Sequence, residues 1–312
     1  QMSQVDAIPE PQYSLTKDQT HNKFSRTIPP VLTVPSGSVI EMFTEEASDQ
    51  QLTQDSDTIA LVNISFDPIH PLTGPVFVEG AAPGDILAVR FHKIETLGWG
   101  WAAIIPGFGF LASEFPQRVY RTFVIDTISQ TVAFNDKIKL PLKPFAGVIG
   151  VAPDTDSLLN TIPPRANGGN MDDPNITEGT TVYLPVFVVG ALFSLGDAHV
   201  VQGLGEVSGT AIEAPMRFIV ELNLLKGANP IKEPQYETDD YYAVTAFGTT
   251  IDIAAKKAVQ YMIDYLMAEH QLEKSEAYML CSFAGDLKIA EVVDMPHVLV
   301  TMHISKEVLG VK

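Results

Sequence analysis

Cysteine is nearly absent from this sequence, as are clusters of basic residues and long hydrophobic runs. Cys281 is the single cysteine, which excludes an internal disulfide framework and a cysteine-based zinc cage. Lys and Arg number 20 against 38 Asp and Glu, so the net charge is -18 and no basic run occurs. Because nucleic acids and anionic membranes bind clustered Lys and Arg, we expect neither as a partner. No segment approaches the roughly 18 consecutive apolar residues of a membrane-spanning helix.

Several catalytic signatures are also missing. The sequence has no G-x-S-x-G elbow, no glycine–serine cluster of the amidase-signature kind, no H-E-x-x-H, no phosphate-cradling loop and no dinucleotide fingerprint. Cys281 lies in the apolar run AYMLCSFAG without a nearby cation, which predicts a core residue rather than a nucleophile. Covalent hydrolysis by serine or cysteine is therefore unsupported, and water activated by a metal or a carboxylate remains.

What is present is enough apolar sequence for a large core. Of 312 residues, 46% are hydrophobic, which suits one large domain or two closely packed ones. Alternating apolar and polar residues with Pro and Gly punctuation predict short strands up to about residue 245, and helical spacing follows over 250–285. We expect a mainly-β protein organised as an N-terminal arm (1–20), a mainly-β body that carries the site (21–215) and a smaller α/β part with two C-terminal helices (216–312).

The first twenty residues are polar and lack the hydrophobic core of a signal peptide. A chain that opens on Gln1 suits either a cytoplasmic protein or the mature form of an exported one, so the compartment stays open. The apolar sheet and the two late helices favour a homo-oligomer, with a dimer as the commonest case.

The stretch SLGDAHVVQGLGEVSGTAIEAP gathers acidic residues and a histidine in an otherwise apolar setting. Asp197 and His199 follow a buried strand at positions i and i+2, so an extended backbone points both side chains to one side. A carboxylate and an imidazole on one face form half of a divalent metal site. Flanking glycines allow tight turns that return Glu206 and Glu213, as a further ligand and a general base. The alternative is that Asp197 caps a turn and His199 is a core histidine.

Two other segments carry candidate ligands. In RANGGNMDDPN, Gly168 and Gly169 offer backbone N–H groups and Asn170 and Asp172 offer compact polar side chains, although the segment also reads as a tight turn. His21 precedes the first clear strand, where a lone histidine is more often a surface residue than a ligand.

Two further positions flank a possible pocket. His70 lies in HPLTGP, a turn that places it beside a pocket or simply in a proline-fixed loop. Trp99 and Trp101 share one face of a strand, as core residues or as the wall of a small-substrate pocket.

Six segments occur in an order that resembles the acetamidase/formamidase family: PVLTVPSGSVI, HPLTGPVFVEGAAPGDIL, PFAGVIGVAP, GGNMD, LPVFVVGALFSLGDAHVVQGLGEVSGTAIE and GDLKIAEVV. The resemblance runs from about residue 20 to 305. It implies hydrolysis of short aliphatic amides to a carboxylate and ammonia, and a CUB-like or jelly-roll β-sandwich with a smaller α/β part.

The resemblance also transfers positions. It covers Gly196, Asp197 and His199, then Gln202, Gly203, Gly205 and Glu206, then Glu213, and Gly168 to Asp172, while His21 matches a histidine ahead of the first strand. Leu204 is a departure, because the family usually has aspartate there. If that aspartate touches metal or substrate, this chain is expected to prefer another amide or to have lost activity.

Together these residues predict a metal-assisted amidohydrolase. Asp197 and His199, with Glu213 or His21, would hold a divalent cation, most readily zinc. Glu206 would act as general base, and Asn170 with the glycine amides would bind the oxyanion. Gln202, His70, Asp172 and Trp101 would contact substrate, with Trp99 and Phe108 in the apolar wall. The alternatives are a non-catalytic β-sandwich with a structural calcium, or a hydrolase of another linear or cyclic amide.

Overall fold

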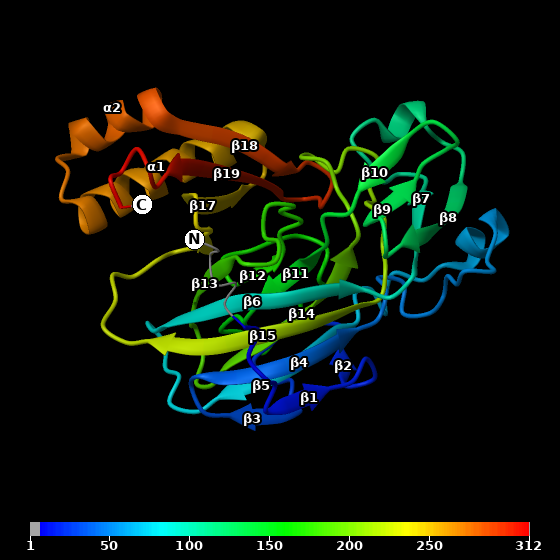
Figure 1. Ribbon diagram of the computed structural model, residues 1–312, viewed down its shortest axis with the longest axis horizontal. Helices are drawn as coiled ribbons and strands as arrows, with labels where there is room; N and C mark the ends of the chain where they lie inside the picture. Colours follow the sequence, from blue (N-terminus) through cyan, green and yellow to red (C-terminus); the bar gives the residue numbers. More distant parts are fainter. Residues whose placement is uncertain (1–6, 312) are drawn as a thin grey trace.

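The computed structural model describes residues 7–311, and the predicted mainly-β architecture is confirmed (Figure 1). Two sheets pack face to face, a third small sheet lies at one end, and a helical layer covers the far part of the large sheet. The main core fills the space between the two facing sheets and includes Phe91 and Phe218 from one and Phe193 and Leu195 from the other. This arrangement is a β-sandwich with a smaller α/β part, as expected.

The large sheet runs through both the sandwich and the α/β part. Its strands, in spatial order, are β1 (Tyr13–Leu15), β4 (Ser38–Thr44), β15 (Met216–Leu225), β6 (Ile86–Thr96), β13 (Thr181–Pro185), β16 (Gln235–Glu237), β17 (Tyr241–Gly248), β19 (Val298–Ser305) and β18 (Gly285–Glu291). Strand β15 pairs with both β4 and β6, so the predicted boundary at residue 215 falls at the edge of a strand central to the sandwich. The division into parts stays a prediction.

The second sheet carries the site. Its strands, in order, are β12 (Gly168–Asn170), β11 (Phe145–Gly150), β14 (Ala191–His199), β5 (Leu72–Val78) and β2 (Thr20–His21), with β3 (Leu32–Val34) parallel to β5. All nine residues of β14 are buried, as its continuous apolar sequence predicts. The apolar run that contains it is two strands in different sheets, since β13 precedes β14 and belongs to the large sheet.

The small sheet consists of β7 (Trp99–Ile104), β8 (Val119–Asp126), β9 (Thr131–Ala133) and β10 (Lys139–Pro141). Two 3-10 turns flank it, η1 (Thr58–Asn63) and η2 (Ala112–Glu114). Strand β7 places Trp101 against the second sheet, because the residues around Glu213 bridge the two.

The two predicted helices are α1 (Ile251–His270) and α2 (Lys274–Ala284). Thr250 caps α1 as predicted, its hydroxyl accepting a hydrogen bond from the backbone N–H of Ile253. The helix packs its apolar stripe on β17 and β19. Cys281 is 4% exposed within this second core, which confirms its structural assignment. Neither described helix combines the length and hydropathy needed to cross a membrane.

Two expectations differ from the structure. Of the predicted arm, residues 1–6 lie outside the described residues, and Tyr13–Leu15 forms β1 at the edge of the large sheet, with Leu15 buried. The arm is therefore not loose over that part. The segment RANGGNMDDPN, which also read as a tight turn, contains the short strand β12, because backbone pairing with β11 fixes its glycines.

Candidate active site

The site lies where β14 ends. Asp197 and His199 close this buried strand, and Asp197 Oδ2 is 3.4 Å from His199 Nε2. Their i and i+2 spacing thus brings both side chains to one side, as the sequence predicts. His199 is completely buried, with the ring of Phe145 packed edge-on against it.

Glu213 is brought to this histidine by backbone pairing on two sides. Its N–H and C=O bond to Trp101 on β7, and the N–H of Ala214 bonds to the carbonyl of Ala198 on β14. The segment is thereby clamped between the small sheet and the second sheet. Glu213 Oε2 lies 3.0 Å from His199 Nε2, the shortest of the acid contacts that this nitrogen makes.

Two further acids approach the same nitrogen of His199. Asp172 Oδ1 and Glu206 Oε2 each lie 3.8 Å from His199 Nε2. Glu206 is held there because Gly205 exchanges backbone hydrogen bonds with Ala290 and Val292 at the end of β18. Asp172 follows β12 directly. Four carboxylates therefore surround one imidazole nitrogen.

Asp294 is a site residue that the sequence reasoning missed. It is buried and lines the same cavity, and its Oδ2 has no hydrogen-bond partner among the described residues. Glu291 positions this turn by accepting hydrogen bonds from the N–H groups of Val293 and Asp294. The available signal was acids within the apolar run IAEVVDMP, the same anomaly that marks the stretch around Asp197.

Gln202 fixes the tautomer of His199. The Gln202 amide nitrogen donates to the carbonyls of Asp172 and Ala290, so its oxygen faces the ring. That oxygen accepts the hydrogen of His199 Nδ1 at 3.0 Å. Nε2 is thus the nitrogen that faces the acids, either protonated or bound to a cation. Gln202 therefore orients the histidine, and its predicted contact with substrate stays a prediction.

The buried carboxyl groups of this cluster can ionise together only if a positive charge compensates them. Burial raises the pKa of Glu206, Glu213 and Asp294 well above the usual carboxyl range. Burial also opposes ionisation of Asp197, but the facing His70 and His199 outweigh it and hold the Asp197 pKa low.

His199 shows the complementary effect. Burial alone would lower its pKa, yet Glu213 and Asp197 outweigh it and raise the pKa well above the usual value. No lysine or arginine is among the described residues that line the cavity. Uncompensated burial of carboxylates costs several kcal/mol each, so the cluster needs a cation or shared protons.

The residues present fit a metal ion. Two groups offer ligand atoms within 4.8 Å of one another: Asp197, His199 and Glu213, and Asp172, His199 and Glu206. In addition, Asp172 Oδ1, Asp197 Oδ1 and His199 Nε2 are buried without a hydrogen-bond partner among the described residues. Orphaned buried acceptors around one nitrogen are what a cation would satisfy.

Three of these acids have left-handed backbone. The φ angles are 46° at Asp172, 52° at Asp197 and 47° at Glu206. Residues other than glycine seldom adopt this conformation, and it concentrates at functional sites. The fold thus accepts local strain to aim these side chains inward. Gly147 on β11 makes room for them, because an added Cβ would overlap Asp172 Oδ1 and lie 2.7 Å from Asp197 Oδ2.

A cavity of about 50 Å³ adjoins the acids. His70 and Trp101 line it, as the sequence predicts for a pocket. His70 Nε2 lies 3.6 Å from Asp197 Oδ2, and Trp101 Nε1 donates to Glu46 Oε1 at 3.3 Å. The apolar side of the wall is completed by Ala47, Phe66, Ile69, Ile105, Phe108 and Ile162. Trp99 is not among the lining residues.

Three predicted residues do not take their expected places. His21 is not brought to the acids, because Nδ1 donates to the carbonyl of Lys23 and Nε2 bonds to Ser194 Oγ, so neither nitrogen is free for a metal. Gly168 and Gly169 pair with β11 and do not line the cavity. Their amides are therefore not available to an oxyanion, and the prediction that they bind substrate is corrected.

Asn170 and Asp172 do reach the cavity. Asn170 Nδ2 donates to the carbonyl of Ile162 at 2.8 Å, while its Oδ1 is buried without a partner. Asn170 therefore presents an acceptor rather than the oxyanion donor that was predicted. Leu204, where an aspartate was expected, is 47% exposed, so this departure removes no carboxylate from the buried cluster.

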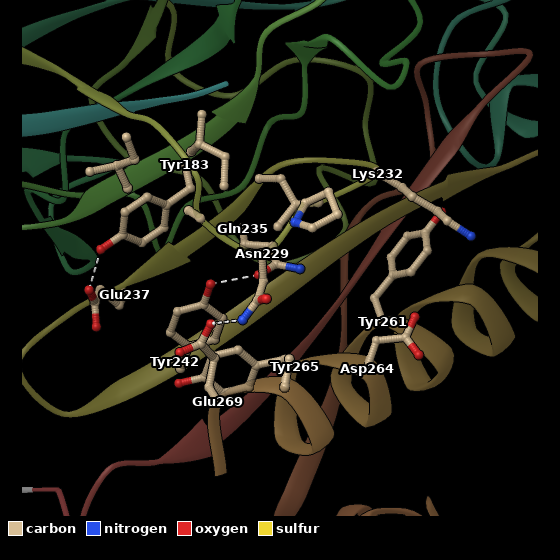
Figure 2. Close-up of a pocket in the computed structure, with 16 residues that line it drawn as sticks. Tyr183, Asn229, Lys232, Gln235, Glu237, Tyr242, Tyr261, Asp264, Tyr265 and Glu269 are labelled. Carbon is tan, nitrogen blue, oxygen red and sulfur yellow. Dashed lines mark hydrogen bonds between the residues drawn. The ribbon is translucent and has the colours of Figure 1, made fainter. Parts of the chain in front are cut away.

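A larger groove lies elsewhere and is unrelated to the acids. It measures about 590 Å³ and lies between α1 and the loop after β15. Figure 2 shows its wall of tyrosines, with Tyr183 and Tyr242 from the large sheet and Tyr261 and Tyr265 from α1. None of the cluster residues lines it. The volume of a pocket therefore does not identify the one that the acids line.

This chain is similar in sequence and structure to known acetamidases and formamidases. The profile of the Acetamidase/Formamidase family matches residues 9–160 and 156–310. A predicted acetamidase/formamidase from Thermoanaerobacter tengcongensis is 34% identical with a TM-score of 0.90, covering 96% of this chain and 98% of that one. The acetamidase structure from Bacillus halodurans is 31% identical with a TM-score of 0.89, covering 95% and 98%. The acetamidase of Mycolicibacterium smegmatis is 27% identical over 308 residues, 76% of each chain.

Proposed function

The chain belongs to the acetamidase/formamidase family, and from this premise we propose that its buried acid cluster holds a divalent cation for the hydrolysis of short aliphatic amides. The protein is an amidase, a hydrolase of the carbon–nitrogen bond of linear amides, with a carboxylate and ammonia as products. One observation carries the proposal for the site: four buried carboxylates face a single imidazole nitrogen, and no lysine or arginine is among the described residues lining the cavity.

Zinc is the cation that we propose. Each ligand group contains one imidazole nitrogen and two carboxylates, a donor set typical of zinc, whereas calcium sites use oxygen ligands alone. We assign Asp197, His199 and Glu213 as ligands, because Glu213 and Asp197 make the shortest contacts with His199 Nε2. When bound, such an ion supplies a Lewis acid that polarises a carbonyl and acidifies water.

Glu206 is the proposed general base. It belongs to the second ligand group, with Asp172, its Oε2 lies 3.8 Å from His199 Nε2, and it lines the cavity. Its carboxylate would take a proton from the attacking water and return it to the departing nitrogen, so that ammonia leaves. Burial and the neighbouring Asp172 raise the pKa of Glu206 well above the usual carboxyl range, so its carboxylate holds a proton more readily than an exposed one does.

Asn170 would hold the amide group of the substrate. Its partnerless Oδ1 is a hydrogen-bond acceptor at the cavity, and a primary amide offers N–H donors. Trp101 and Phe108 close the apolar side. A water-sized volume is about 10–15 Å³ on this measure, so a 50 Å³ cavity has room for about four heavy atoms. That volume suits formamide and acetamide.

An ammonia-release assay over formamide, acetamide, propionamide and butyramide tests this function. We expect the highest kcat/KM for the two smallest amides, falling by about tenfold for each methylene beyond the cavity's capacity. Absence of ammonia release from all of them would contradict the function. Preference for a cyclic or N-substituted amide would replace this substrate class with the alternative left open by the sequence.

Gly147→Ala is predicted to lower kcat/KM for acetamide by about 100-fold, because the new methyl group displaces Asp172 and Asp197 by a fraction of an ångström or more. Gly203→Ala is the matched control, since a Cβ at Gly203 meets nothing within 4 Å. Kinetics of both variants, with thermal unfolding as a check on folding, provide the measurement. Equal activity of the two variants would show that the positions of these carboxylates do not matter.

The homodimer remains a prediction that sedimentation velocity would measure. Charge gives no reason to expect nucleic acid as a partner, since the chain has 38 acidic residues against 20 basic ones.

A further inference from the structure

A second pocket adjoins the catalytic cavity. It measures about 330 Å³, and Thr250 is the one polar side chain among its lining residues, which carry no charge. The others are Gly107, Phe108, Gly109, Phe110, Ile162, Ile251, Val292, Val293, Met295 and Val298. A ligand that fills such a space must be apolar, because a polar group placed there would lose its hydration without gaining hydrogen bonds.

The two spaces share a wall. Phe108 and Ile162 line both the cavity and the pocket. The chain segment after β18 also separates them, since Asp294 lines the cavity while its neighbours Val293 and Met295 line the pocket. Phe108, Ile162 and the segment around Asp294 therefore separate the acids from the apolar pocket.

Phe108 is held in this wall by its surroundings. Its ring stacks on Phe66 with centroids 5.5 Å apart and planes at 17°. Gly109 beside it has a φ of 107°, and a Cβ there would lie 3.0 Å from the carbonyl oxygen of Ser208. The segment is thus seated against the turn that follows Glu206, which fixes Phe108 relative to the general base.

We propose that the 330 Å³ pocket is a subsite for the alkyl chain of longer aliphatic amides, and that Phe108 is the specificity-determining residue that closes it. This inference rests on the proposed amidase function. The cavity alone holds only about four heavy atoms, whereas the pocket adds space for a chain of several methylenes. With Phe108 in place, the enzyme takes short amides; without its ring, the two spaces join.

The test is the ratio of kcat/KM for hexanamide to kcat/KM for acetamide. In Phe108→Ala we expect this ratio to rise roughly 100-fold, because each newly buried methylene contributes about three- to fourfold. The matched control is Phe134→Ala, since Phe134 lines neither space and packs under Arg121 at the surface. Its ratio should equal that of the unmodified protein.

A second substitution tests where the chain lies. Phe110 lines the pocket but not the cavity, and it is largely exposed. Adding Phe110→Asp to Phe108→Ala introduces a carboxylate into the pocket, which should reverse most of the gain with hexanamide. Phe108→Leu and Ile162→Ala provide smaller openings if Phe108→Ala does not fold, and each should raise the ratio by a lesser amount.

The outcomes separate this inference from the function on which it rests. If the unmodified protein releases ammonia from acetamide and none of the Phe108 or Ile162 variants changes the ratio, the subsite is overturned while the amidase stands. A rise that Phe110→Asp does not reverse would place the alkyl chain elsewhere and also overturn it. If the unmodified protein hydrolyses no amide, the function itself fails.

Discussion

Replacing His199 with glutamine is expected to remove both the bound cation and amide hydrolysis. Glutamine is neutral and of similar reach, but its amide nitrogen cannot bind a metal as the imidazole nitrogen does, and it is this imidazole nitrogen that faces four carboxylates at 3.0–3.8 Å. We expect kcat/KM for acetamide to fall by about 10⁴-fold or more. A bound cation stabilises the transition state by several kcal/mol, and losing that stabilisation raises the activation free energy by the same amount.

His92→Gln is the matched control. His92 contacts a single carboxylate, Glu221, at 3.2 Å on the large sheet, away from the cavity. The His92→Gln variant should keep both the bound cation and the amidase activity. Metal content and ammonia release are measured on the two variants together. Undiminished turnover in His199→Gln would remove the histidine from the mechanism.

Glu206→Gln is expected to keep the cation and lose turnover. The amide cannot accept a proton, so kcat should fall by about 10²–10⁴-fold while metal content stays near that of the unmodified protein. Glu213→Gln should instead lower metal content, because its carboxylate makes the shortest contact with His199. Glu221→Gln, on the large sheet, is the control for the substitution itself.

These two variants also separate the two ligand groups. If Glu206→Gln loses the metal and Glu213→Gln keeps it, the cation is bound by Asp172, His199 and Glu206 instead. The general base would then have to be another group. Unchanged kcat in Glu206→Gln would exclude it as the base in either arrangement.

The sequence predicted those parts of the site that depend on one chain segment. Asp197 and His199 lie two residues apart at the end of a strand buried on both faces, so their short separation along the chain keeps them together even though Asp197 has left-handed backbone. Glu206 and Glu213 also follow within a short glycine-rich stretch. The mainly-β class and both helices could also be predicted from the sequence, because the alternation of apolar and polar residues and the helical spacing of apolar residues are local patterns.

The site residues that the sequence missed or misplaced depend on contacts between segments that are distant along the chain. Asp294 joins the cavity only because the end of β18 bonds to Gly205, and no local pattern encodes that pairing. His21 was expected at the metal, but β2 pairs with β5 and directs the ring to Ser194. Gly168 and Gly169 were expected to bind an anion, and they instead permit close packing of β12 on β11.

The site also shows how the fold trades stability for function. Five carboxyl groups lie buried together, and three of their residues have left-handed backbone. Each feature is costly without a compensating ligand. The fold retains them at the end of a strand whose nine residues are all buried, where the packed surroundings would hold the acids rigidly.

Metal analysis of the purified protein, paired with ammonia release before and after chelation, tests the central claim most directly. The account predicts about one zinc ion per chain, loss of acetamide hydrolysis when it is removed, and recovery when zinc is restored. Full hydrolysis of acetamide by protein that holds no metal, with His199 and its four acids intact, would contradict it.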